Sequence, residues 1–382
     1  MDHPVVSFRA IAVLPPRTGY FLWWSACGRP VYGFNVRKVI LTHTLSSSHQ
    51  DNLVRWNPSQ SSGSYESHFI KVNLPDQAAA FWWKFTILQP VSSRDPTQFE
   101  VWAIVFDSND PSRSCAVKDR FEAADSTVDR DRLYCRYGDN ILEHGHTQGA
   151  IEGVQAIEWD IHWDPPENGF RHFPKAWMYK GRIPKAKALS PVPSAPFRGT
   201  VRVADKTYVL DGHPGMQGHN WGVQHAEQWV WVHSNQFLQE QTAFFEAVSS
   251  KIKLGPLRSP QLTILHLEDG VHDPLTINSW SGMLGTQSTL DGLQWSFRGT
   301  QGKRAIEGLF MAPPERFVAI NYTDPDGRIT HCLNSKIAQG EIRVLHRSGA
   351  GWRLKRTLTT GSSAALEIGL KDELRGVKLH LS

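Results

Sequence analysis

A block of glycines, imidazoles, carboxamides and indoles is the part of this chain best equipped for chemistry. Glycines at positions 212, 215, 218 and 222 flank His219, Asn220 and Trp221. Glycines so closely spaced predict a backbone that turns sharply or approaches another group closely. Imidazole and carboxamide groups can move a proton or polarise a carbonyl, so we interpret His219 and Asn220 as candidate catalytic residues and Trp221 as a substrate-binding residue. The structural alternative is a hydrogen-bonded network that pins one corner of a β-barrel.

The residues after this block predict a strand with an aromatic face. Alternation with period 2 over residues 228–237 places Trp229, Trp231, His233 and Asn235 on the same side. Buried indole and amide groups need hydrogen-bond partners, and a strand face of this kind resembles the wall of a pocket. Trp229, Trp231 and Asn235 are therefore candidate substrate-binding residues.

A second polar set lies on two earlier strand-like segments. Glu66 and His68 share one face of residues 65–72, and Lys84 shares a face with Trp82 in residues 81–88. An unpaired charge inside a barrel costs several kcal/mol, so the carboxylate and the ammonium either pair there or lie on outward faces. On the functional interpretation, Glu66 is an acid or base with a shifted pKa, Lys84 is an electrostatic anchor and Trp82 binds substrate. On the structural one, Glu66 and Lys84 are surface residues and His68 is a hydrogen-bonded structural imidazole.

The elements that position these residues should be mainly β-strands. Period-2 segments rich in β-branched and aromatic residues recur along the chain, whereas a sustained period of 3.6 is rare. Residues 65–72, 81–88 and 100–106 predict a meander. Further strands are expected at 157–163, 199–203, 207–210, 228–237, 242–249, 261–267, 292–299, 305–311, 317–322, 341–346, 352–359 and 365–370.

Two segments break this pattern. Residues 114–121 predict a short helix, one of few in the chain. Residues 183–197 carry four prolines and predict a linker or a long surface connection.

Composition and charge bound the class of protein. A chain of 382 residues usually exceeds one hydrophobic core, so two domains are expected. The net charge of +4 is small and its signs are interspersed, which makes nucleic acid a poor candidate partner. No long apolar run predicts stable membrane insertion, and residues 1–4 do not resemble a signal peptide, so we expect a soluble, cytoplasmic protein. The 15 tryptophans are the compositional anomaly.

Metal, redox and cofactor signatures are weak. The four cysteines form no CxxC pair, and reduced thiols are favoured over a Cys115–Cys135 disulfide. Residues 324–327 predict a hairpin turn rather than a calcium loop, and residues 143–146 suit an exposed loop better than a metal site. No GxSxG, HExxH, Walker or strand-linked GxGxxG motif occurs. We therefore expect neither a metal nor a cofactor.

The residues His219, Asn220, Trp221 and Gly222, with Trp229 and Trp231 behind them, support a family resemblance. Together with the strand at residues 65–69, they resemble the lipocalin-like superfamily that includes carotenoid 1,2-hydratase, AttH-type proteins and fungal Diels–Alderases. The resemblance implies an all-β protein of two lipocalin-like antiparallel β-barrel domains packed side by side, at residues 1–250 and 251–382. It also implies apolar ligands, bound in a barrel or between barrels. One departure is Gly218, because the hydratase pattern has an aspartate immediately before the histidine.

These observations favour a cofactor-independent cyclase, isomerase or hydratase that acts on a hydrophobic small molecule, of isoprenoid or polyketide origin. An aromatic pocket can hold a polyene in a reactive conformer, and indole faces stabilise developing cationic charge. Because Gly218 replaces the expected acid, Glu66 becomes the strongest acid–base candidate. Two other classes stay open: a non-catalytic carrier of a lipophilic molecule, and a carbohydrate-binding protein whose tryptophans stack on sugars.

Overall fold

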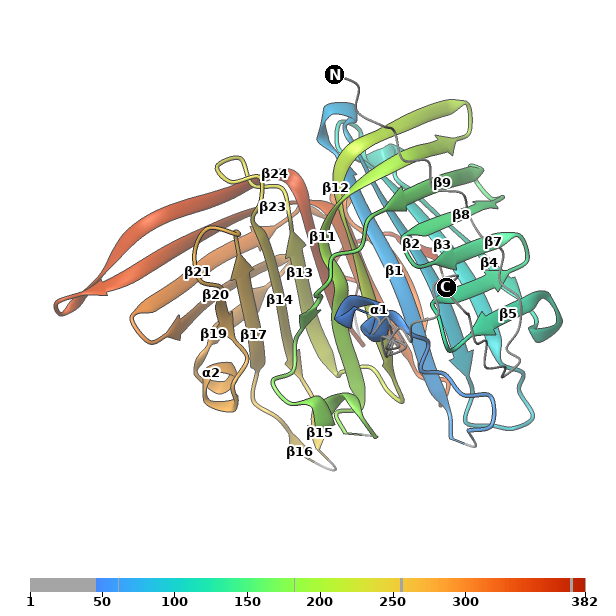
Figure 1. The fold of residues 1–382 in the computed structure, drawn as a ribbon, viewed down its shortest axis with the longest axis horizontal. Coiled ribbons are helices and arrows are strands. Elements are labelled where there is room, and N and C mark those ends of the chain that lie inside the picture. The colour runs from blue at the N-terminus through green and yellow to red at the C-terminus, as the bar shows by residue number, and fades with distance from the viewer. Residues whose placement is uncertain (1–45, 61, 182, 255–256, 372–373, 382) are drawn as a thin grey trace, which may run out of the picture. The chain divides into compact units, whose positions relative to one another are not determined.

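Antiparallel β-sheet makes up most of the computed structural model, which describes residues 46–60, 62–181, 183–254, 257–371 and 374–381 (Figure 1). Within these residues the α-helices are α1 (Ser47–Asn52) and α2 (Trp280–Gly285). No helix in the described part of the chain is long and apolar enough to cross a membrane. The expected all-β class with few short helices is confirmed.

The first sheet runs from β1 to β12 and contains the predicted meander. Its strand order is β4-β3-β2-β1-β12-β11-β9-β8-β7-β6-β5, with β10 paired to β11. The strands are β1 (Ser64–Leu74), β2 (Ala79–Gln89), β3 (Gln98–Asp107), β4 (Cys115–Phe121), β5 (Ser126–Asp129), β6 (Tyr134–Tyr137), β7 (Asn140–Glu143), β8 (His146–Ile151), β9 (Ile157–Trp163), β10 (Phe170–Arg171), β11 (Ala186–Val203) and β12 (Lys206–Gly222).

The second sheet begins at β13 and follows the order β18-β17-β14-β13-β24-β23-β21-β20-β19, while β22 pairs with β23 and β25. A separate hairpin joins β15 (Lys253–Leu254) to β16 (Leu257–Arg258). The strands of the second sheet are β13 (Gln228–Ser234), β14 (Phe244–Lys251), β17 (Leu262–Glu268), β18 (Leu275–Ile277), β19 (Gln287–Asp291), β20 (Gln294–Gln301), β21 (Arg304–Met311), β22 (Val318–Thr323), β23 (Ile329–Ser348), β24 (Gly351–Leu370) and β25 (Leu379–Leu381).

Each sheet encloses its own apolar core, and a third apolar cluster joins the two sheets. Strand β2 explains how one element serves two cores, because successive side chains point to opposite faces. Phe81 and Trp83 lie in the core of the first sheet. Trp82, between them, packs in the shared cluster with Trp231 of the second sheet. The expected architecture of two antiparallel sheets packed side by side is confirmed, and their closure into two lipocalin-like barrels stays a prediction.

Two predicted elements are wrong. Residues 114–121 form strand β4 instead of a helix, because pairing with β3 buries Cys115 and Val117. Residues 183–197 are not a linker but belong largely to β11. Its prolines at 191 and 193 fall where the register with β12 shifts, and β9 joins the other edge only from Phe197 onward. Proline is tolerated at such bulges and open edges because no ladder N–H is needed there.

The change from one sheet to the other occurs between Gly222 and Gln228. The boundary expected near residue 250 therefore falls at the end of β14, inside the second sheet, and the division into two domains stays a prediction. The turn expected at residues 324–327 is present, with a hydrogen bond of 2.8 Å from the Gly327 N–H to the Asp324 carbonyl. Cys115, Cys135 and Cys332 are free, so the alternative disulfide does not form; Cys27 and residues 1–4 lie outside the described part of the chain.

Candidate functional site

A cavity of about 360 Å³ lies between the two sheets. This volume is in the range of small-molecule sites. Side chains of β1, β2, β11 and β12 face those of β13, β14, β17, β22 and β24, and residues 172–178, 183–185, 224–227 and α2 contribute to the lining too. Its aromatic lining residues are Tyr65, Phe69, Trp82, Phe173, Trp229, Trp231, Trp280 and Tyr322.

Two glycines allow aromatic rings to lie flat against neighbouring strands at this cavity. Phe69 pairs with Gly218, and Trp229 pairs with Gly369. A Cβ on Gly218 would lie 2.1 Å from the Phe69 ring, and one on Gly369 would lie 2.2 Å from the Trp229 ring. The predicted close approach is confirmed, whereas the sharp turn is wrong because residues 219–221 continue β12 in register with β1.

Replacing Gly218 by alanine is expected to lower the free energy of unfolding by about 1–3 kcal/mol, because the Phe69 ring must leave its place. Chemical denaturation measures this change. Gly361→Ala is the matched control, since a Cβ there meets open space, and it should change the stability by less than about 0.5 kcal/mol. Equal stabilities of the two variants would contradict this account of the glycine.

Glu246 brings a buried carboxylate to the cavity. Its Oε1 accepts hydrogen bonds from Ser190 Oγ at 2.7 Å and Trp231 Nε1 at 3.0 Å, and lies 3.0 Å from His172 Nε2. Its Oε2 is buried without a hydrogen-bond partner. Burial alone would raise the pKa of Glu246, but the charge and hydrogen bond of His172, together with the Trp231 N–H, lower it to about 2. The cavity lining thus contains an ionised carboxylate, one oxygen of which has no hydrogen-bond partner.

Lys84 brings an ammonium group to another part of the cavity lining. Its Nζ lies 3.6 Å from the centre of the Tyr322 ring, a close cation–π contact. Burial lowers the pKa of Lys84 to about 8, although the nearby carboxylate of Glu367 opposes that shift. Near neutral pH the group is therefore a cation that gives up its proton more readily than an exposed lysine.

Glu66 and Lys84 do not pair, and neither lies on the surface. Their exposed fractions are 2% and 6%. The pairing of β1 with β2 sets Phe69 beside Lys84, and alternation then turns Glu66 to the opposite face of the sheet. Both alternatives left open by the sequence, an ion pair in one barrel and two surface residues, are therefore wrong.

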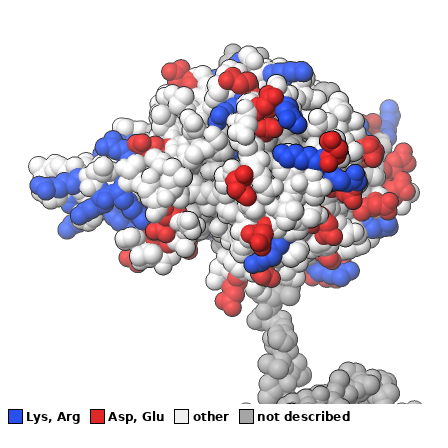
Figure 2. Space-filling view, turned by 90° about the horizontal axis from the view of Figure 1, so that it is seen from above, with Lys and Arg blue, Asp and Glu red and all other residues white. Residues whose placement is uncertain are grey.

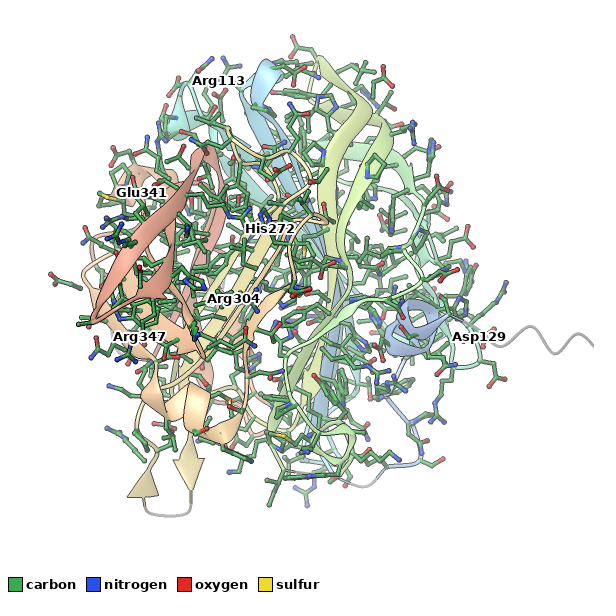
Figure 3. All side chains as sticks on the ribbon, turned by 60° about the vertical axis from the view of Figure 1, so that its left-hand side comes forward. Arg113, Asp129, His272, Arg304, Glu341 and Arg347 are labelled. Carbon is green, nitrogen blue, oxygen red and sulfur yellow. The ribbon has the colours of Figure 1, made fainter. Side chains whose placement is uncertain are left out.

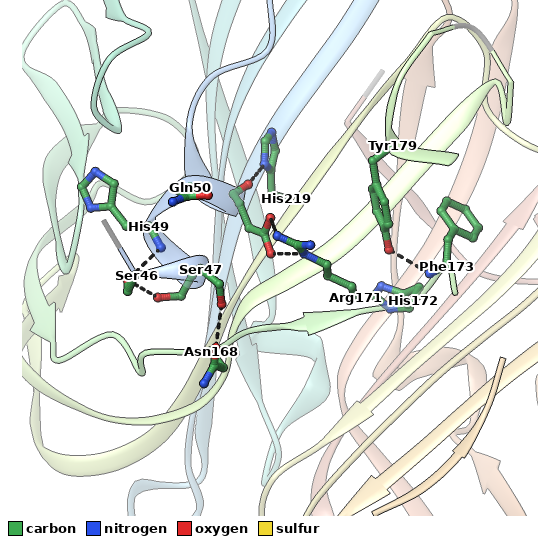
Figure 4. A network of polar contacts seen from close by, with 12 residues as sticks. Ser46, Ser47, His49, Gln50, Asn168, Arg171, His172, Phe173, Tyr179 and His219 are labelled. Atoms are coloured by element: carbon green, nitrogen blue, oxygen red, sulfur yellow. Dashed lines mark hydrogen bonds and ion pairs between the residues drawn. The ribbon is translucent and has the colours of Figure 1, made fainter. Parts of the chain in front are cut away.

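His219 and Glu66 belong to a buried network that holds α1 and the chain after it. Figure 4 shows the hydrogen bond that joins His219 to α1. His219 Nε2 lies 2.7 Å from Glu66 Oε1, and His219 Nδ1 donates to the Asp51 carbonyl at 2.7 Å. Glu66 also accepts from the backbone N–H groups of Arg55 and Trp56. Burial raises the pKa of Glu66 and lowers that of His219 to about 3. Burial thus disfavours the charged form of both groups.

The ligand atoms of Glu66, His68 and His219 lie within 4.8 Å of one another, close enough to suggest a metal site. The geometry argues against one. The two imidazoles are stacked, with ring centres 4.0 Å apart and planes 16° apart, so their in-plane lone pairs do not converge on a common point. His68 Nε2 is also hydrogen-bonded to the Asn52 carbonyl at 2.9 Å. We therefore interpret the three residues as a hydrogen-bonding cluster.

The structure separates the predicted site residues into two groups, and their roles stay predictions. Trp82, Lys84, Asn220, Trp229 and Trp231 line the cavity. Four others do not: Glu66, His219, Trp221 and Asn235. Alternation along β12 puts Asn220 on the cavity face and turns His219 and Trp221 to the other.

Asn235, on the second sheet, instead donates to the Gly215 carbonyl at 2.9 Å and accepts from Lys71 Nζ at 3.4 Å. It therefore connects the two sheets beside the cavity.

Sequence reasoning missed many polar or aromatic residues of the lining, among them Tyr65, His225, Glu246, Tyr322 and Glu367. His225 stacks on Tyr65, with ring centres 4.1 Å apart, and its Nδ1 lies 2.7 Å from Asp324 Oδ1. Asp324 was interpreted only as part of a turn. These contacts join residues from distant parts of the chain, which no local pattern could indicate.

Comparisons with known proteins agree with the resemblance inferred from residues 219–222. A family model described as tocopherol cyclase-like matches residues 193–370. Two uncharacterized proteins of Mycobacterium tuberculosis, from strains CDC 1551 / Oshkosh and ATCC 25618 / H37Rv, are each 28% identical over 218 residues, 57% of this chain. The match covers 62% of the length of each relative.

Two solved structures are similar to this chain. An AttH-like protein of Nitrosomonas europaea has a TM-score of 0.47 at 11% identity, with 81% of this chain and 92% of that chain covered. Kievitone hydratase from Nectria haematococca has a TM-score of 0.46 at 10% identity, with 87% of this chain and 96% of that chain covered.

Proposed function

We propose that this chain is a cyclase- or hydratase-type enzyme that acts, without a cofactor, on a hydrophobic substrate in the cavity between its sheets. The observation that carries the proposal is the ionised Glu246 carboxylate, whose Oε2 is buried without a partner in an aromatic cavity. The match to the tocopherol cyclase-like family model supports the same enzyme class.

The proposed reaction is addition of an O–H group across a carbon–carbon double bond. The Lys84 ammonium gives a proton to one alkene carbon, and cationic character develops on the other carbon. Ring faces of Trp82, Trp229, Trp231 and Tyr322 stabilise that charge. The oxygen forms the new C–O bond and its proton passes to Glu246. Glu246 then releases that proton to solvent, and solvent returns one to Lys84. In cyclisation the O–H belongs to the substrate, and in hydration it belongs to water.

Other predicted residues take supporting roles in this proposal. Asn220 lines the cavity and offers a carboxamide to the oxygen of the substrate. Glu66 and His219 are positioning residues, because their hydrogen bonds go to each other and to residues 51–56 rather than to the cavity. In this proposal Lys84 and Glu246 are the acid and the base, in place of Glu66, which the sequence indicated.

The test is conversion of a phenol that carries an unsaturated isoprenoid chain. Purified protein should convert it to a product of unchanged mass and altered chromatographic retention, or to one heavier by a single water. Saturable binding without conversion across a series of chain lengths would contradict the enzyme and support the carrier. The carbohydrate alternative is disfavoured because Trp82 and Trp231 are buried and cannot serve as open sugar platforms.

The pH profile of kcat/KM assigns the proton donor. If Lys84 gives the proton, the rate should fall as pH rises through about 8, where Lys84 loses its charge. Lys84→Gln should remove this limb along with most activity. Lys187→Gln is the matched control, because Lys187 also lines the cavity and burial lowers its pKa to about 8. If the fall in kcat/KM above about pH 8 disappears in the Lys187 variant and not in the Lys84 variant, Lys84 is not the proton donor.

A further inference from the structure

We infer that the mouth of the cavity docks onto an anionic lipid surface. Four large apolar side chains lie exposed on two segments at this mouth: Trp177 at 55%, Ile183 at 70%, Trp280 at 50% and Leu284 at 54%. Ile183 and Trp280 also line the cavity. We call these four residues the apolar rim.

The fold holds the apolar rim in place from both sides. Met178 and Met283 are buried and line the cavity, so each anchors a segment whose neighbours Trp177 and Leu284 are exposed. In α2, Trp280 and Leu284 are four residues apart and share one face of the helix. Asn278 Nδ2 donates to the His172 carbonyl at 3.1 Å and ties the two segments together. The exposure of the rim is therefore built into the fold.

Three of the segments that line the cavity contain no acidic residue, whereas a fourth, at residues 224–227, carries Glu227. No Asp or Glu occurs in residues 168–204, 247–267 or 274–290. Lys175, Lys180, Lys185 and Lys251 are exposed in them. Exposed tryptophans and leucines surrounded by lysines are typical of surfaces that settle into the headgroup region of anionic bilayers.

A bilayer fits this surface better than a protein partner because the rim surrounds an opening. Figure 1 shows α2 and the β15–β16 hairpin at the same end of the sheets. With the rim at the headgroup level, an apolar molecule could pass from lipid to cavity without crossing water. The identity of that molecule rests on the proposed function, whereas docking is measured without turnover.

A second basic surface provides the competing interpretation. The distal part of the β23–β24 hairpin carries Arg343, Arg347, Arg353, Lys355 and Arg356, and Figure 2 shows Lys and Arg gathered on this projection. Figure 3 shows Arg347 and Glu341 on this hairpin. None of these residues lines the cavity. Charge alone could attract the hairpin to lipid, so the experiment must separate the two surfaces.

Co-sedimentation with vesicles tests the inference. The full chain should bind vesicles of phosphatidylcholine with phosphatidylserine and bind pure phosphatidylcholine at least ten-fold more weakly. Trp177→Ser with Trp280→Ser, and Lys175→Glu with Lys180→Glu, should each weaken binding about ten-fold or more. Circular dichroism confirms that each variant is folded.

Two matched double variants serve as controls. Leu238→Ser with Val271→Ser removes apolar side chains that are 76% and 73% exposed and lie outside the cavity lining. Arg347→Glu with Arg353→Glu reverses charge on the hairpin. Both should bind as the wild type does. Equal binding to both vesicle types, or loss of binding in the hairpin variant alone, overturns the inference. A protein that binds vesicles but converts no substrate refutes only the proposed function.

Discussion

Glu246→Gln is expected to reduce turnover by about 10²–10⁴-fold, the usual contribution of a positioned acid or base, while the protein stays folded and still binds ligand. The carboxylate is the proposed acceptor of the substrate O–H proton, and an amide cannot take that role near neutral pH. Glutamine has nearly the same shape as glutamate but carries no charge. Binding should persist because the aromatic walls of the cavity are untouched.

The three contacts at Oε1 make glutamine the informative substitution. Its carbonyl oxygen can still accept from Ser190 and Trp231, and its NH₂ group takes the place of the unpartnered Oε2. Alanine would instead leave those buried donors without an acceptor. Removing one partner of a buried charged network typically costs about 3–5 kcal/mol. A loss of turnover in Glu246→Ala could therefore come from unfolding as well as from the missing base.

Single-turnover assays with the isoprenoid phenol, beside ligand binding by fluorescence titration, separate the two effects. Glu240→Gln is the control, because Glu240 lies outside the cavity lining and makes the same change of charge. A Glu246→Gln variant that keeps kcat within a few-fold of wild type would show that the carboxylate only supports the wall. A large rise in KM alone would assign Glu246 to substrate binding.

The correct predictions from the sequence came from period-2 alternation of apolar and polar residues. This alternation located many of the strands, although not β5 to β8. It also grouped Trp82 with Lys84, and Trp229 with Trp231, all of which line the cavity. Alternation tells which residues share a face, but not what that face contacts. Glu66 was grouped correctly with His68, yet this face turned out to be the one opposite Lys84. The face that carries Lys84 lines a cavity only because the second sheet packs against it.

Glu246 shows what long-range packing adds. It lies in a segment correctly predicted as a strand, between Phe244 and Val248 on the same face. A carboxylate flanked by apolar side chains is a local signal of a buried charge. Its partner His172, however, is 74 residues away. The structure of β11 was missed for a related reason: prolines predict a break until the bulges and open edge that accommodate them are known.

Stability should fall steeply as the pH drops below 6.5. His68 and His233 are buried, and burial lowers the pKa of each to about 3. An unfolded chain binds a proton at each near the ordinary value of 6.5, whereas the folded chain stays neutral. Between these values each of the two imidazoles binds one more proton in the unfolded state, so together they should lower the free energy of unfolding by about 3 kcal/mol per pH unit.

The buried carboxyl groups of Glu246 and Glu66 affect the pH dependence of the free energy of unfolding in different ways. The Glu246 pKa of about 2 lies below its unfolded value, so this residue adds a further loss of stability only below about pH 4.5. In the Glu66–His219 pair, burial raises the pKa of the carboxyl and lowers that of the imidazole. The two shifts act on stability in opposite directions as the pH falls, so the pair adds less slope than its imidazole alone would.

Denaturant titrations at pH 7, 6 and 5 measure the slope, and His233→Gln tests its source. His233 Nε2 donates to the Pro193 carbonyl at 2.8 Å and its Nδ1 has no partner, so a glutamine amide can replace the donor without a titrating group. The slope should fall by about 1.4 kcal/mol per pH unit, because one excess proton is removed. His162→Gln on β9 is the control, since that side chain is exposed. An unchanged slope in the His233 variant would mean that the acid sensitivity arises elsewhere and that this imidazole is not held neutral by burial.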